Sequence, residues 1–183
     1  MVALKGRLLV ATPMLDDPNF DRSVVWVLEH GEEGALGVVL NRPSDLPLAE
    51  PLPEWSDLAG ALPVVFVGGP VSAGSVIGLA RVVGEVPPGV WEPVVGSIGV
   101  IDLTADPVLL ASAVTSLRCF AGYAGWGPEQ LESELVEGAW LVVDADPGDP
   151  FSEDPRRLWR TVLARQPNPL ARLAHVPDDP SLN

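Results

Sequence analysis

Cysteine is nearly absent from this chain of 183 residues, because Cys119 is the only one. A single thiol excludes an internal disulfide framework and any zinc site built from several thiolates. Basic residues are also scarce, with 11 Lys and Arg against 25 Asp and Glu and a formal net charge of −14. Since binding to a phosphate backbone needs clustered Lys and Arg, we do not expect a nucleic-acid partner, and direct DNA binding is the least favoured function.

Segments that would enter a membrane are missing as well. The apolar run after Lys5 and Arg7 covers only Leu8 to Ala11, which is too short for the hydrophobic part of a signal peptide. Residues 58–80 carry no charge and are long enough to span a bilayer, but glycines and prolines interrupt them. Such interruptions predict two buried strands around a tight turn. We therefore expect a cytoplasmic protein with no membrane partner.

The composition supports a folded chain. Hydrophobic residues make up 47% of the sequence and charged residues 20%, which excludes disorder and is sufficient for one buried core. The sequence shows neither an internal repeat nor a linker between domains. We expect residues 1–183 to form a single domain.

Hydrophobic patterning predicts strands first and helices mostly in the second half. Short apolar runs predict strands at 8–12, 24–28, 35–40, 64–67, 76–83, 99–103 and 139–145. Continuous runs of this kind indicate burial on both faces. Helical spacing, proline and capping residues predict helices at 106–117, from 128 onward and at 155–165.

Four motifs, in order over nearly the whole chain, carry a resemblance to a known family. They are Phe20-Asp21-Arg22-Ser23-Val24-Val25 with Glu29-His30; Gly34-Ala35-Leu36-Gly37-Val38-Val39-Leu40-Asn41-Arg42-Pro43; Gly68-Gly69-Pro70-Val71; and Phe120-Ala121-Gly122-Tyr123-Ala124-Gly125-Trp126-Gly127-Pro128-Glu129-Gln130-Leu131-Glu132 with Glu134 and Gly138-Ala139-Trp140. The sequence resembles the YqgE/AlgH family, bacterial-type and largely uncharacterised proteins sometimes labelled transcriptional regulators. The resemblance implies an α+β fold, in which a bifurcated or barrel-like, mostly antiparallel sheet is flanked by helices.

Three strand ends that bear glycine or proline suggest one ligand pocket. The residues concerned are Asn41, Arg42, Gly68, Gly69, Gly125, Trp126 and Gly127. The guanidinium of Arg42 suits phosphate or carboxylate, and a helix that opens at Pro128 would add backbone amides. The alternative is that these residues only form turns, because neither a G-x-G-x-x-G loop nor a P-loop is present. We predict a small anion or phosphate-type ligand at this pocket.

Residues for nucleophilic catalysis are few. Cys119 has only His30 and His175 as possible bases, and no cysteine-enzyme signature surrounds it. The serine nucleophile elbow G-x-S-x-G is absent. We predict no catalytic residue and no cofactor, and an enzyme using Cys119 stays an alternative.

Carboxylates offer a second alternative. Asp16, Asp17 and Asp21, or the acidic loop 144–154, would supply oxygen ligands to a hard cation, but neither group has calcium-loop spacing. We therefore predict no metal site.

The function favoured is a non-enzymatic regulatory or ligand-binding module, with an enzyme using Cys119 or a carboxylate-bound metal as one alternative. A protein–protein adaptor is another, since Trp159 lies among arginines and would suit an acidic partner if it were exposed.

Overall fold

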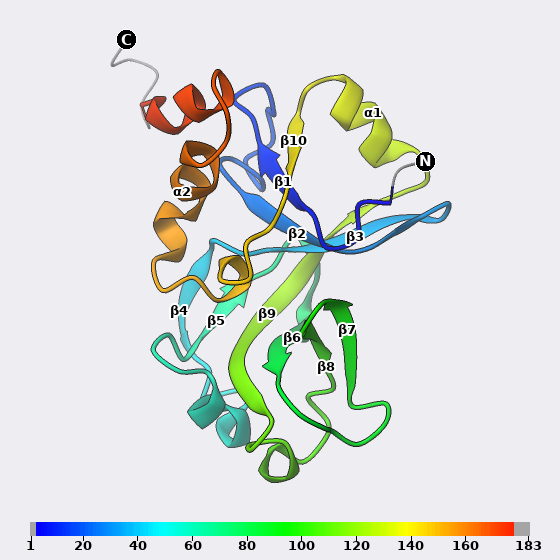
Figure 1. Ribbon diagram of the computed structural model, residues 1–183, viewed down its shortest axis with the longest axis vertical. Coiled ribbons are helices and arrows are strands. Elements are labelled where there is room, and N and C mark those ends of the chain that lie inside the picture. Colours follow the sequence, from blue (N-terminus) through cyan, green and yellow to red (C-terminus); the bar gives the residue numbers. More distant parts are fainter. Residues whose placement is uncertain (1–2, 178–183) are drawn as a thin grey trace.

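The computed structural model describes residues 3–177 of the chain (Figure 1). Within them the chain forms ten strands, two α-helices and five short 3-10 helices. The strands are β1 Leu8–Ala11, β2 Val24–Gly31, β3 Gly34–Val39, β4 Pro43–Pro47, β5 Val64–Val67, β6 Val71–Val82, β7 Trp91–Val95, β8 Ile98–Ile101, β9 Val114–Trp126 and β10 Trp140–Val143. The helices are α1 Gln130–Val136 and α2 Leu158–Ala164, with 3-10 helices at Pro53–Leu58, Pro107–Leu109, Asp149–Phe151, Pro155–Arg157 and Leu170–His175.

The sheet is open and mostly antiparallel. Its order is β10-β1-β2-β3-β9-β6-β8-β7, while β5 pairs with β9 and β4 pairs with β5. Only the β5–β9 pairing is parallel among the described strands. The mostly antiparallel sheet fits the expected α+β class. The barrel-like form is wrong, because β10 and β7 end the order without pairing with each other.

The sheet divides along one edge of β9. β6 pairs with the other edge over most of its length. On the dividing edge, β5 pairs with Cys119–Ala121 and β3 pairs with Ala124–Trp126. Figure 1 shows β9 running between β5 and β6. Because β5 and β6 follow one another in the chain, the connection between them must cross β9.

Glycines make this crossing possible. A side chain on Gly68 would overlap the carbonyl oxygen of Gly122, and a side chain on Gly69 would overlap the carbonyl group of Tyr123. Gly122 is restricted in the same way, since its Cβ would overlap the carbonyl oxygen of Gly69. Gly122 also has a positive φ of 71°, a conformation that costs other residues energy. The two backbone segments therefore touch with no side chain between them.

The first strands are buried on both faces, as their continuous apolar runs predicted. In β1, Leu8 and Val10 pack in one cluster with Trp159 of α2. The alternate residue Leu9 packs in a second cluster with Leu131 of α1. Successive side chains of a strand point to opposite faces, so the two helices cover opposite sides of this part of the sheet. Figure 1 shows α1 and α2 on either side of β1 and β10.

A third cluster lies at the other end of the sheet. It contains Trp55, which lies in the 3-10 helix that begins at Pro53, and it includes Cys119 of β9. The indole Nε1 of Trp55 donates to the carbonyl of Leu103 at 3.1 Å. This cluster fixes the chain before β5 against the first half of β9.

The predicted helix at 106–117 is wrong. Asp106 does cap a helical turn, with its carboxylate accepting the N–H of Val108 at 2.9 Å, but this 3-10 helix ends at Leu109. From Val114 the chain is a strand paired on one edge with β6. Tertiary pairing and the β-branched residues at the start of β9 outweigh the helical spacing. Of the other two helical predictions, the one from 128 onward corresponds to α1, and the one at 155–165 corresponds to the 3-10 helix Pro155–Arg157 followed by α2.

We expect Gly122→Ala to destabilise the fold by at least about 2 kcal/mol, because the added Cβ meets backbone atoms and the φ is unfavourable. Urea unfolding measures the change in the free energy of unfolding. Gly148→Ala is the matched control, since Gly148 has a φ of −82° and no other atom lies within 4 Å of the position that its methyl group would take. We expect a change within about 0.5 kcal/mol for this control. Equal losses in both variants would show that the crossing does not constrain residue 122.

Candidate functional site

Asn41 and Arg42 are engaged with the backbone of residues 19–24. The amide of Asn41 accepts one backbone N–H at 3.0 Å and donates to a carbonyl at 2.9 Å. The guanidinium of Arg42 donates to the carbonyl of Asn19 and, at 3.1 Å, to that of Asp21. Partial burial lowers the pKa of Arg42, and two nearby aspartates oppose the shift. Both side chains hold this loop against the end of β3.

Gly68 and Gly69 lie next to Arg42, as predicted. The N–H of Val67 donates to the carbonyl of Arg42 at 2.8 Å. The N–H of Gly68 is used within the sheet, where it donates to the carbonyl of Ala121 at 2.8 Å. The structure thus brings these four predicted residues together, and hydrogen bonds within the chain already use donors of Asn41, Arg42 and Gly68.

Trp126 and Gly127 lie near the other end of β3. Trp126 pairs with Ala35 at the beginning of β3, whereas Asn41 follows the end of β3. The structure therefore places Asn41 and Arg42 at one end of β3 and Trp126 at the other. Gly69 and Gly125 lie between them, since a side chain on Gly69 would overlap the backbone of Tyr123 and Ala124. The seven predicted residues are thus spread along β3 rather than gathered at Arg42.

The residues around Trp126 form an aromatic cluster. The Nε1 atoms of Trp126 and Trp140 both donate to one carboxylate oxygen of Glu134 at 2.8 Å. Phe20 stacks on Trp126 and meets Trp140 edge on. The N–H of Gly127 donates to the side chain of Gln130 at 3.0 Å, so the start of α1 is occupied by its own chain. These contacts give the part of the fourth sequence motif around Trp126 a packing role.

Cys119 is fully buried, and burial raises the pKa of its thiol to about 12. A thiol with so high a pKa is not a thiolate near neutral pH, and the thiolate is the nucleophilic form. His30 is held elsewhere: its Nδ1 accepts the N–H of Leu4 at 3.2 Å and its Nε2 lies 2.9 Å from Glu132. The structure therefore offers no activated thiol at Cys119.

The carboxylates do not gather. No group of three or more His, Cys, Asp or Glu within residues 3–177 is arranged to hold a metal ion. In the first candidate group, Asp17 accepts the N–H of Asn19 at 2.8 Å in a turn. In the acidic loop, Asp149 is bound by the guanidinium of Arg165.

Trp159 is not available to a partner, so the adaptor alternative finds no exposed tryptophan at this position. Its side chain is buried, and its Nε1 donates to the carbonyl of Ala11 at 2.9 Å. The guanidinium of Arg22 lies over its ring at 5.0 Å from the centroid. The apolar face of α2 draws Trp159 into the core.

Neither α-helix among the described residues has the length or apolar character to cross a membrane.

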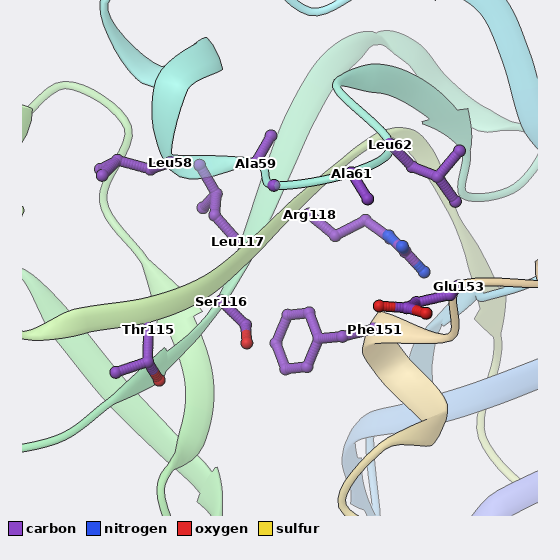
Figure 2. A pocket seen from close by; sticks show the side chains of 11 residues that line it. Leu58, Ala59, Ala61, Leu62, Thr115, Ser116, Leu117, Arg118, Phe151 and Glu153 are labelled. Carbon is purple, nitrogen blue, oxygen red and sulfur yellow. The ribbon is translucent and has the colours of Figure 1, made fainter.

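A hollow of about 160 Å³ lies where three segments meet. The segments are the loop 58–62 before β5, residues 115–118 at the start of β9, and the loop that carries Phe151 and Glu153. Figure 2 shows the side chains of all three segments around this space, with the guanidinium end of Arg118 directed toward the carboxylate of Glu153.

Arg118 is the unusual residue of this hollow, because it is charged and only 6% exposed. Its guanidinium lies over the ring of Phe66 at 4.4 Å from the centroid. Among the described residues it makes a single long hydrogen bond of 3.5 Å, to the carbonyl of Pro150. No carboxylate of the described residues lies within ion-pair distance of it. Burial lowers the pKa of Arg118 to about 10.

Several N–H groups of Arg118 therefore have no partner among residues 3–177. No fully buried side-chain nitrogen or oxygen in the described part lacks a hydrogen bond. The unbonded nitrogens of Arg118 must then be in contact with the open space of the hollow. The hydroxyl of Ser116, two residues earlier on β9 and thus on the same face, also lines the hollow and makes no hydrogen bond within the described chain.

Sequence reasoning missed Arg118. The signal present was an arginine between Leu117 and Cys119, followed by the apolar Phe120. A charged residue within an apolar run is notable once the run is known to be a strand. The predicted helix at 106–117 hid this, because it ended directly before Arg118 and left the start of the strand unrecognised.

The AlgH-like family model matches residues 8–171 of the chain. The chain belongs to the AlgH-like family. The predicted resemblance is therefore confirmed. A UPF0301 protein of Streptomyces avermitilis is 60% identical, over 99% of this chain and 96% of that protein. A UPF0301 protein of Mycobacterium tuberculosis is 44% identical, over 97% of this chain and 90% of that protein.

Two solved structures are also similar. The crystal structure of protein DIP2367 from Corynebacterium diphtheriae matches with a TM-score of 0.89 at 31% identity, over 95% of this chain and 93% of that one. The solution structure of the AlgH protein from Pseudomonas aeruginosa matches with a TM-score of 0.67 at 34% identity, over 89% of this chain and 88% of that one. Membership of the AlgH-like family fixes the fold, and the chemistry has to be argued from the residues.

We expect the thiol of Cys119 to resist alkylation in the folded protein, because it is inaccessible and protonated. Incubation with iodoacetamide at pH 8, followed by intact mass measurement, tests this. The native protein should gain no adduct within an hour, and the urea-unfolded protein should gain one. Rapid labelling of the native protein would contradict the burial of Cys119.

Proposed function

We propose that this AlgH-like protein is a non-enzymatic, cytoplasmic ligand-binding module, and that its ligand is a small molecule whose carboxylate or phosphate-type group binds Arg118. The observation that carries the proposal is a buried guanidinium that faces a hollow and meets no carboxylate among residues 3–177. A ligand that binds only the folded state stabilises it, so occupancy of the hollow would raise the free energy of unfolding.

The energetics favour an anionic group in this position. Removing a charge from water costs several kcal/mol unless a partner replaces the lost hydration. The ring of Phe66 supplies part of that compensation. The remaining N–H groups form a planar fork that matches the two oxygens of a carboxylate or phosphate. An oxyanion in the hollow would complete the hydrogen bonding of Arg118.

The proposed ligand still carries an anionic group, as the sequence predicts, but the residue that binds it is Arg118 instead of Arg42. Arg42 was expected to bind the anion, but its guanidinium already donates to two backbone carbonyls. Arg118 makes one hydrogen bond where Arg42 makes two, and Arg118 is the one of these two arginines that lines the hollow. A volume of about 160 Å³ is several times the share of one water molecule, about 30 Å³ in the liquid, which suits a small molecule rather than a polymer.

We expect carboxylates or phosphate to raise the Tm of the protein, and this rise to be lost in Arg118→Met. Acetate, propanoate and inorganic phosphate are compared with chloride at matched ionic strength by thermal unfolding. At a concentration near one hundred times Kd, binding adds about 2.7 kcal/mol to the free energy of unfolding, a Tm rise of several degrees. Arg42→Met is the matched control and should keep the response.

The stability of Arg118→Met separates binding from a structural role. Replacing an uncompensated buried charge by an apolar side chain should leave the free energy of unfolding unchanged or increase it. If Arg118→Met instead loses several kcal/mol, and no anion shifts the wild-type Tm, Arg118 is a packing residue and the proposed function is wrong.

A further inference from the structure

Glu153 faces Arg118 across the hollow without forming an ion pair. Both residues line the space, and Figure 2 shows their charged groups directed toward one another. Their nearest nitrogen and oxygen atoms are more than 4.0 Å apart, since ion pairs within that distance include neither residue. Glu153 itself is exposed, and Arg118 is buried. The hollow thus has a buried positive end and an open negative end.

We propose that the hollow binds a free α-amino acid with an apolar side chain. This inference rests on the proposed function and names its ligand class. The carboxylate of the amino acid lies against Arg118, and its ammonium group lies against Glu153. The two charges of an amino acid are adjacent, so one ligand fills the gap between guanidinium and carboxylate and pairs with both.

Charge favours such a ligand over a plain anion. Glu153 repels an anion that approaches Arg118, whereas it attracts the ammonium group of an amino acid. The whole chain carries a formal net charge of −14, which repels free anions but not a molecule without net charge. A phosphate dianion meets both repulsions, and an amino acid meets neither.

The remaining walls favour an apolar side chain. They include Leu58 and Leu62 on one segment and Phe151 on another. Within the described part of the chain, no basic side chain other than Arg118 lines the hollow, so an acidic side chain finds no second cation there. Ser116 also lines the hollow, and its hydroxyl can hydrogen-bond to the carboxylate of the ligand or to a bound water.

Isothermal titration of amino acids against their deaminated counterparts tests this inference on the wild-type protein. The pairs are L-alanine with propanoate, L-valine with 3-methylbutanoate, and L-leucine with 4-methylpentanoate, with 3-methylbutylamine and inorganic phosphate as further probes. We expect at least one amino acid to bind tenfold or more tightly than its counterpart, and both amine and phosphate to bind more weakly.

Glu153→Gln should remove this preference. We expect the affinity for the amino acid to fall about tenfold and the affinity for its deaminated counterpart to rise. Asp154→Asn is the matched control, since Asp154 is the neighbouring exposed acid and does not line the hollow. Its carboxylate oxygen Oδ2 lies 4.0 Å from Nε of Arg157. It should leave both affinities unchanged.

The outcomes separate the inference from the proposed function. If plain carboxylates bind as tightly as the amino acids, the amino acid ligand is wrong and an anion site at Arg118 stands. If Glu153→Gln raises both affinities equally, Glu153 only competes for Arg118, which also overturns the inference. If no amino acid, carboxylate or phosphate binds, both proposals fail.

Discussion

The contact of two bare backbone segments at Gly122 is the constraint on which the rest of the sheet depends. The connection between β5 and β6 crosses β9 there, and Gly68 becomes part of the sheet as it passes. Its carbonyl accepts the N–H of Val39 and its N–H donates to the carbonyl of Ala121, both at 2.8 Å. A glycine in this place links β3 to β9 just beyond their paired residues. The crossing therefore holds β3 and β5 on the same edge of β9 and makes the sheet fork.

The hollow follows from the same crossing. Because the connection is so short, β5 has to run parallel to β9, with Val65 opposite Cys119. The loop 58–62 leads directly into β5, so this register lays the loop over the first half of β9, where Arg118 lies. A burial that is unfavourable for Arg118 alone is imposed by favourable contacts elsewhere, namely the cluster around Trp55 and the strand pairing. Fold and hollow are in this sense one structure.

Local patterns predicted what local patterns can decide. The apolar runs located β1, β2 and β3, and the motif around Gly68 and Gly69 marked the turn between two strands. They could not locate β9, because residues 106–117 combine a good helix cap with apolar residues at helical spacing, and only pairing with β6 decides against the helix. The same limit applies to the site. Arg42 and Arg118 look alike in sequence. Their surroundings differ through residues far away in the sequence, since Arg42 donates to the carbonyl of Asn19 and Arg118 lies over the ring of Phe66.

A buried arginine without a counterion reduces the stability of a packed fold, and other residue types at this position would reduce it less. An apolar side chain at residue 118 would fill the space beside Phe66 and avoid desolvation of a charge. Elsewhere the chain satisfies its polar groups with care: two indoles share Glu134, and Asp149, though buried, is paired with Arg165. Local rules that hold throughout a protein and fail at one place tend to fail at a functional site. The guanidinium of Arg118 is not paired in this way. Its unbonded nitrogens face a hollow that has an opposite charge at its open end, and this combination distinguishes a binding residue from a packing defect.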